Sequence, residues 1–263
     1  MARAATRERQ APAPEVEVLE RGNIYFFYVP RVQEEAPQGI EEIQRFYMVL
    51  SPQGAQRHRL IVVGRKKLPE IKDGGERTWA FVDKVATRPE EVEQELERVA
   101  YPTKTRGARE RPPARPAGEG VYALVWHGDH THLAFSLELP WKPGQVQREL
   151  DIPEEGSYII SVKNPEQPSP PWAGLQPERK AELPKHLQER FRGRRFIDPN
   201  PPDFLNYEGA ELLLIGAAAD VKAELGIDLD PQRETERTAE IFRQLKLERD
   251  EHPVEPLFTG EWR

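Results

Sequence analysis

The sequence of 263 residues contains no cysteine. Disulfide bonds, a thiolate nucleophile, and zinc or iron–sulfur centres held by cysteine are therefore excluded. The chain also lacks any run of about eighteen apolar residues, so we expect no transmembrane helix and no membrane partner. Residues 1–16 carry basic side chains without the apolar stretch of a secretory signal, which favours a disordered N-terminal tail and a cytoplasmic protein.

Common catalytic and nucleotide-binding motifs are missing as well. The sequence has no G-x-x-x-x-G-K-[ST], G-x-G-x-x-G, G-x-S-x-G or H-E-x-x-H pattern, and these patterns accompany phosphate loops, dinucleotide sites, serine hydrolases and zinc proteases. Because no complete set of catalytic residues is recognisable, the sequence favours a protein without enzymatic activity. The formal net charge of −7 disfavours a protein that coats nucleic acid through its overall charge, although it leaves room for local basic patches.

Short apolar and aromatic segments separated by turn signals fill the first part of the chain. They are rich in β-branched and aromatic residues, which predicts an antiparallel meander of strands at residues 23–30, 45–51, 57–64 and 77–85. The segment Leu60–Val63 is apolar on both faces, so we expect a sheet that is covered on both sides. Thr87, followed three residues later by Glu90, is typical of a capping box and predicts a helix at residues 87–99.

A stretch rich in arginine and proline, residues 102–120, has almost no apolar content and is predicted to be a linker or a long loop. It separates residues 17–101, the unit of antiparallel strands and one helix, from residues 121–263. The second unit opens with a β-hairpin and continues with mixed helices and strands. We therefore expect an α+β fold, an N-terminal antiparallel β-meander with one helix followed by a mixed α/β region. The two units could be separate domains or one body.

The hairpin at residues 121–139 contains three histidines close together. Gly128 and Asp129 form a two-residue turn that pairs His127 with His130. His127, His130 and His132 then share one face, and opposed residues have Cβ atoms about 5 Å apart. Three imidazoles at this spacing could hold a divalent metal ion, with Asp129 or Glu138 as a further ligand or as a hydrogen-bond partner that orients a ligating imidazole. The alternative is a solvated hairpin tip with polar side chains.

The other face of this hairpin is almost unbroken in its apolar character. Side chains on neighbouring strand positions alternate between the two faces. This face is therefore predicted to lie in the core, and its residues are Tyr122, Leu124, Trp126, Leu133, Phe135, Leu137 and Leu139.

Two arginine-rich stretches are candidates for contact with phosphate or nucleic acid. The first lies in residues 102–120 and comprises Lys104, Arg106, Arg109, Arg111 and Arg115. The second comprises Arg190, Arg192, Arg194 and Arg195, with Phe191 and Phe196 available to stack on bases. The alternatives are a solvated linker and a basic helix end that is favoured by the helix dipole.

Trp172 lies in a polar, proline-rich loop and is a candidate anchor for a partner, because tryptophan is enriched among the residues that dominate binding interfaces. The alternative is that Trp172 folds back and covers its own domain.

Several segments of the sequence carry a family resemblance, among them "ERGNIYFFYVPRV", "RLIVVGRKKLPEI", "PAGEGVYALVWHGDHTHLAFSLELP" and "DFLNYEGAELLLIGA". In these segments, from about residue 19 onward, the chain resembles a family of bacterial conserved hypothetical proteins. The resemblance implies no activity and assigns no functional residue.

We expect a binding or regulatory module without catalysis of its own and without a cofactor, whose partner is a protein or a phosphate-bearing ligand. The first alternative is a metal-dependent hydrolase that uses His127, His130 and His132. A further alternative is a nucleic-acid processing accessory protein that uses the two arginine stretches.

Overall fold

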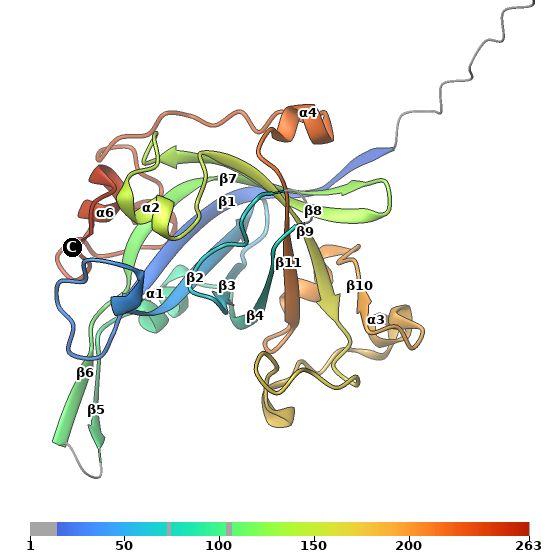
Figure 1. The fold of residues 1–263 in the computed structure, drawn as a ribbon, viewed down its shortest axis with the longest axis horizontal. Helices are drawn as coiled ribbons and strands as arrows, with labels where there is room; N and C mark the ends of the chain where they lie inside the picture. Colours follow the sequence, from blue (N-terminus) through green and yellow to red (C-terminus); the bar gives the residue numbers. More distant parts are fainter. Residues whose placement is uncertain (1–14, 73–74, 104–106, 263) are drawn as a thin grey trace, which may run out of the picture.

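The computed structural model describes residues 15–72, 75–103 and 107–262 of the chain. Its main feature is a nine-stranded antiparallel sheet in the order β10-β9-β11-β4-β3-β2-β1-β7-β8. Because β8 also pairs with β9, eight of these strands close into a barrel, and β10 extends the sheet from β9 (Figure 1). The chain therefore forms a closed antiparallel barrel with one additional strand.

The barrel strands, in spatial order, are β9 (Glu155–Lys163), β11 (Glu211–Ala218), β4 (Arg77–Ala86), β3 (His58–Val63), β2 (Ile43–Pro52), β1 (Val16–Pro30), β7 (Arg115–His127) and β8 (His130–Leu139). The extra strand is β10 (Phe196–Ile197). A separate two-stranded hairpin, β5 (Val99–Thr103) and β6 (Gly107–Arg111), projects away from the barrel (Figure 1).

The helices are short and lie outside the barrel. They are α1 (Pro89–Leu96), α2 (Gln145–Glu149), α3 (Lys185–Gln188), α4 (Val221–Leu225), α5 (Ile241–Gln244) and α6 (Glu255–Thr259). Single 3-10 turns occur at Ile40–Glu42, Pro177–Arg179, Glu189–Phe191 and Pro202–Asn206. The predicted helix at residues 87–99 is α1, but Arg88 is its N-cap and no side chain caps it.

The expected α+β fold, a meander with one helix followed by a mixed α/β region, is wrong. The predicted meander exists as β1–β4, but its two outer strands pair with later parts of the chain, β1 with β7 and β4 with β11. Both edges of the meander thus gain backbone hydrogen-bond partners, which an open sheet would leave exposed. Strands from both sides of residues 102–120 therefore build one barrel.

The stretch expected to be a linker or loop, residues 102–120, instead supplies β6 and the first half of β7. Gly120 lies where β7 and β8 approach closely, since a Cβ there would stand 2.1 Å from the carbonyl oxygen of Ser136. Glycine at this position allows the strand pairing that a larger residue would block. The expected N-terminal tail, residues 1–16, lies outside the described residues except for its last two.

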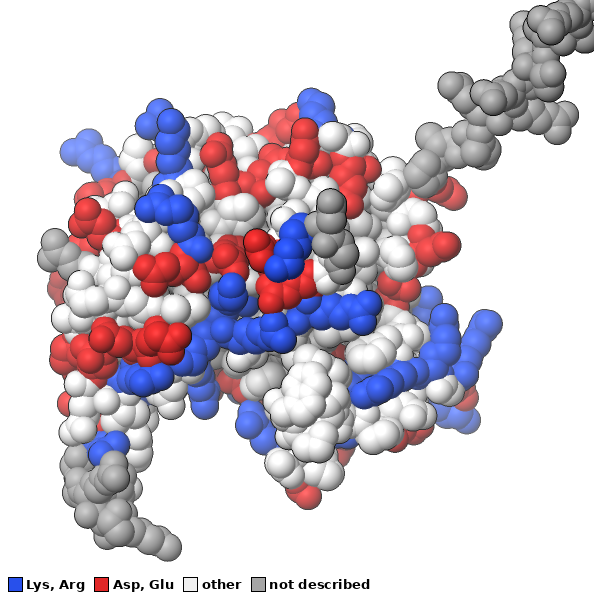
Figure 2. Space-filling view, in the orientation of Figure 1, with Lys and Arg blue, Asp and Glu red and all other residues white. Residues whose placement is uncertain are grey.

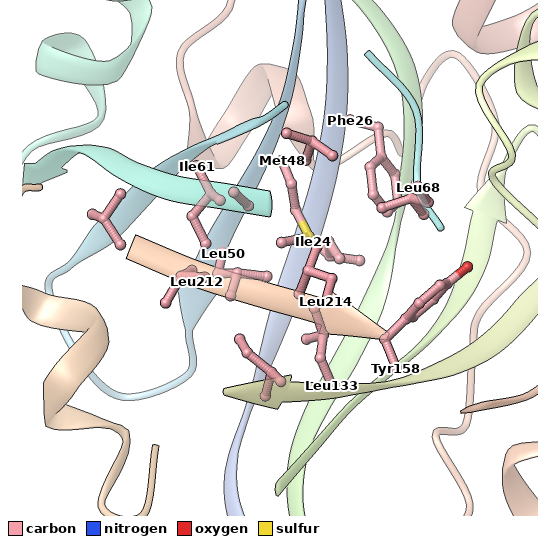
Figure 3. Packing of buried hydrophobic residues seen from close by; sticks show 14 of the residues in the cluster. Ile24, Phe26, Met48, Leu50, Ile61, Leu68, Leu133, Tyr158, Leu212 and Leu214 are labelled. Atoms are coloured by element: carbon pink, nitrogen blue, oxygen red, sulfur yellow. The ribbon is translucent and has the colours of Figure 1, made fainter. Parts of the chain in front are cut away.

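The barrel interior is filled with side chains rather than hollow. Along β1, Ile24 and Phe26 point inward, whereas Tyr25 and Phe27 point outward. Figure 3 shows inward side chains from several strands converging, among them Met48, Leu50, Ile61, Leu212 and Leu214. All of these side chains are fully buried. An eight-stranded barrel is just wide enough for its own side chains to fill.

The outer surface of the barrel is covered unevenly. A second apolar cluster joins the outer faces of β1, β2 and β3 to residues of α1, α5 and α6. A third cluster places Val221 and Leu225 of α4 on the outer faces of β7 and β8. The expectation of cover on both sides holds for these strands. On β4 and β11, however, the outward side chains Trp79, Phe81 and Leu213 stay partly exposed, and the candidate site lies over these strands.

No helix among the described residues has the length and apolar character needed to cross a membrane.

Candidate functional site

The histidine hairpin has the predicted register. His127 pairs with His130, and Val125 pairs with His132. Gly128 has a φ of 60°, the left-handed conformation that the first position of a type II′ turn requires. His127, His130 and His132 therefore lie on the same face of β7 and β8, as the sequence predicted.

That face is not a solvated surface along its whole length. His132 is buried near α4, with its Nδ1 3.9 Å from Oε1 of Glu224. Burial, together with the neighbouring His127 and His130, lowers the pKa of His132 to about 4, so its imidazole is neutral near pH 7. His130 is exposed at the hairpin tip, with its Nδ1 3.8 Å from Oδ1 of Asp198.

His130 and His132 thus have different surroundings, and the ring centroids of His127 and His132 are 5.8 Å apart. Within the described ranges, no group of three or more histidine, aspartate or glutamate side chains is arranged to hold a metal ion. Glu138, considered with Asp129 as a further ligand or as a partner that orients one, accepts a hydrogen bond from the backbone N–H of Gln232 at 2.5 Å. The hairpin therefore places the three histidines on one face, but the described side chains around them do not form a metal site.

On the predicted core face of the hairpin, five residues lie in the barrel interior: Tyr122, Leu124, Leu133, Phe135 and Leu137. Leu139 belongs to the outer cluster instead, because the pairing of β7 and β8 shifts register between Glu119 and Gly120. Trp126 is only partly buried and lines a surface hollow beside the hairpin tip.

The described arginines of the first stretch do not gather into one surface. Lys104 and Arg106 lie outside the described residues. Arg115 is buried and donates to the carbonyl oxygen of Glu35 at 2.7 Å, and Arg111 donates to backbone carbonyls at the end of α1. Arg111 and Arg115 therefore fasten chain segments together.

The second arginine stretch divides between two hollows that lie on either side of β10. Arg190, Arg192 and Arg194 line one hollow. Arg195 lines the other, a cavity of about 700 Å³ on the outer face of β4 and β11. We call the second cavity the tryptophan groove; it is lined by Gly64, Arg65, Arg77, Trp79, Phe81, Pro170, Trp172, Ala173, Gly174, Leu175, Arg195, Phe196 and Leu213.

Aromatic rings form much of the tryptophan groove. Trp79 and Phe196 approach each other with ring centroids 5.8 Å apart. Trp172 lies on a loop that lines the same groove as Trp79 and Phe196. It is 78% exposed, the largest exposed fraction among the bulky apolar residues described. The alternative that Trp172 covers its own domain is therefore not what the structure shows. Its free indole face can contact a planar ligand.

The loop that carries Trp172 is fastened to the barrel by Glu211 of β11. The two carboxylate oxygens accept hydrogen bonds from the hydroxyl of Ser169, both at 2.9 Å, and one also accepts from the backbone N–H of Leu175, at 2.9 Å. Glu211 in turn forms a buried ion pair with Lys163 on β9, at 3.1 Å. The attachments lie on both sides of Trp172 in the sequence, so the exposed ring stands on a tethered support.

The charge of the tryptophan groove is positive. Its described lining residues include Arg65, Arg77 and Arg195 and no aspartate or glutamate. Arg65 is paired with Glu76 at 2.6 Å, whereas Arg77 and Arg195 have no carboxylate partner among the described residues. Figure 2 shows lysine and arginine side chains forming a band across the face in view and gathering again at one side. The groove therefore combines cationic side chains with aromatic rings in a chain of net charge −7.

Sequence reasoning identified Trp172, Arg195 and Phe196 as candidates but missed Arg77, Trp79 and Phe81. These three residues alternate along β4, so they share its outer face. That alternation was visible in the sequence, but the exposure of this face depends on which strands the outer helices cover.

Comparison of the chain with protein-family models, with curated proteins and with solved structures found no match. The resemblance to a bacterial family consequently stays a prediction.

Proposed function

We propose that this protein is a binding module whose site is the tryptophan groove, and that its ligand combines a planar ring with a phosphate group. One observation carries the proposal: an exposed tryptophan on a tethered loop faces a barrel surface that offers further aromatic rings and unpaired arginines.

The ring preference follows from the aromatic side chains. Trp172 is exposed, and Trp79 and Phe196 are partly exposed. Stacking of a base on an aromatic side chain stabilises binding by about 1–3 kcal/mol, and it tolerates different bases because each has a π face.

The phosphate preference follows from the arginines. Arg77 and Arg195 are exposed, and the guanidinium group matches the geometry of phosphate oxygens with two parallel hydrogen bonds. Because no carboxylate neutralises these two arginines among the described residues, a bound anion does not have to displace an existing ion pair.

Titration calorimetry with three related probes tests this function. AMP carries both ring and phosphate, whereas adenosine and ribose 5-phosphate each carry one of them. We expect AMP to bind more tightly than either fragment. Replacement W172A should weaken AMP binding by about 5- to 140-fold, the loss that corresponds to one stacked base.

Tyr101 supplies a matched control, because it is an exposed aromatic residue on β5, outside the groove. Y101A should leave AMP binding unchanged. Failure of AMP to bind, or equal weakening by W172A and Y101A, would rule out the tryptophan groove as the site.

A further inference from the structure

A second hollow lies beside the tryptophan groove. Its volume is about 790 Å³, and it is lined by Trp126, Asp129, Arg190, Arg192, Arg194, Ile197, Asp198 and Asn200. We call it the arginine hollow. It repeats the combination found in the groove, with arginines gathered around a partly exposed tryptophan.

The two cavities share a wall. Arg195 and Phe196 line the tryptophan groove, and Arg194 and Ile197 line the arginine hollow. These four residues are consecutive and include the two-residue strand β10, so this short edge strand contributes side chains to both cavities. An extended ligand that leaves one cavity can reach the other by passing β10.

Charge distribution in the arginine hollow favours an anion at its rim. Arg192 and Arg194 are exposed and have no carboxylate partner among the described residues. Arg190 donates to the backbone carbonyl of Asn200 at 2.7 Å. Two acids also line the hollow: Asp129 is exposed at the hairpin turn, and Asp198 lies 3.8 Å from the imidazole of His130 and accepts a hydrogen bond from the backbone N–H of Thr131 at 3.4 Å. The arginines of the hollow still outnumber its acids.

We infer that the ligand of this surface is single-stranded nucleic acid, which spans the tryptophan groove and the arginine hollow across β10. The inference rests on the proposed function, because it assigns the planar, phosphate-bearing ligand to a polymer. Trp172 and Trp126 provide ring surfaces in the two cavities, and Arg77, Arg192, Arg194 and Arg195 provide cations along the path.

Single strands fit this arrangement better than duplexes or proteins. Stacking needs bases that are free of a paired partner, and aromatic residues interleaved with cations are the usual device for binding a single strand with little sequence preference. The net charge of −7 opposes non-specific coating elsewhere on the molecule. Binding should therefore be confined to this face and should depend strongly on salt.

Fluorescence anisotropy with a labelled oligoadenylate of about 12 nucleotides, a length within the range that one small domain covers, tests the inference. At about 50 mM salt we expect this probe to bind at least about tenfold more tightly than AMP, since it gains contacts in the second cavity. The double variant R192Q/R194Q should weaken oligonucleotide binding and reduce the salt slope by about 1.4, or about 0.7 per lost phosphate contact. AMP binding should not change.

Arg237 provides the matched control, because it is an exposed arginine outside both cavities. R237Q should leave both the affinity and the salt slope as they are. A duplex of the same length and inorganic polyphosphate serve as competitors, and both should compete poorly.

The outcomes separate the inference from the function on which it rests. Equal affinity for AMP and the oligonucleotide, or an unchanged salt slope in R192Q/R194Q, would refute the inference that a single strand spans both cavities. The proposed nucleotide binding in the tryptophan groove would remain. Competition by polyphosphate or duplex as strong as that by the single strand would also overturn it. If neither AMP nor the oligonucleotide binds, both the inference and the proposed function fail.

Discussion

Removing the carboxylate of Glu211 should destabilise the protein and loosen the loop that carries Trp172. In the variant E211A, Lys163 loses its carboxylate partner at 3.1 Å, although its side chain is fully buried. Breaking a buried ion pair from one side costs about 3–5 kcal/mol, because it leaves the other charge uncompensated. Lys163 still donates to the carbonyl oxygens of Asn164 and Gln167, at 2.8 and 2.6 Å. We therefore expect a loss near the lower end, about 3 kcal/mol.

The size of this loss should depend on pH in a defined direction. Burial already lowers the pKa of Lys163 below its ordinary value, and removing Glu211 should lower it further. Between that folded pKa and the unfolded value of about 10.4, the unfolded chain binds more protons than the folded chain. The free energy of unfolding of E211A should therefore rise with pH relative to wild type, so the deficit shrinks from about pH 7 to about pH 9.5.

Urea denaturation followed by circular dichroism at both pH values measures these quantities. E182A is the control, because Glu182 is exposed in the chain segment that follows the loop, and it should have little effect. Replacing both partners, K163M/E211L, should recover the part of the loss that comes from the unpaired charge of Lys163, because no buried charge remains. A loss below about 1 kcal/mol in E211A, or an equal loss at the two pH values, would refute the structural role assigned to the pair.

Two further predictions concern titrating groups on the barrel. Burial raises the pKa of Glu119 to about 7, so the folded state holds this proton more tightly than the unfolded chain does. The free energy of unfolding should therefore fall by on the order of 3 kcal/mol as pH rises from about 4.5 to 7. Urea denaturation should show that E119Q lacks this decline, and an identical pH dependence in both proteins would contradict the prediction. Burial lowers the pKa of His132 to about 4, so the unfolded chain binds this proton more tightly than the folded protein does. The free energy of unfolding should therefore fall as pH falls from about 6.5 to 4. An NMR titration midpoint above about 6 would show that His132 is not buried as described.

Local parts of the fold were predictable because their signals are local. The four strands of the meander and the pairing of His127 with His130 follow from alternation and turn chemistry within short segments. The closure of the barrel was not predictable in this way. It depends on β1 meeting β7 and β4 meeting β11, and such pairings join residues far apart in the chain without a local pattern that specifies them.

The same limit explains the incorrect interpretation of residues 102–120. Their prolines and glycines are typical of loops, yet the stretch contains the first half of β7, where Gly118 and Gly120 permit close packing against side chains and backbone inside the barrel. Gly118 stands against Phe26, since a Cβ there would lie 3.0 Å from that ring. A glycine that allows close approach within a strand and one that permits a turn look identical in a single sequence.

The position of the candidate site follows from two properties of the barrel taken together. Its interior is filled by side chains such as Phe26, Met48 and Leu214, so a ligand has to bind outside. The outer face is covered by α1, α5 and α6 over one group of strands and by α4 over another. A tethered loop stands over the part of β4 and β11 where Trp79 and Leu213 remain partly exposed. Because the helices leave that face open, its aromatic side chains and the arginines beside them are accessible to the ligand that we propose.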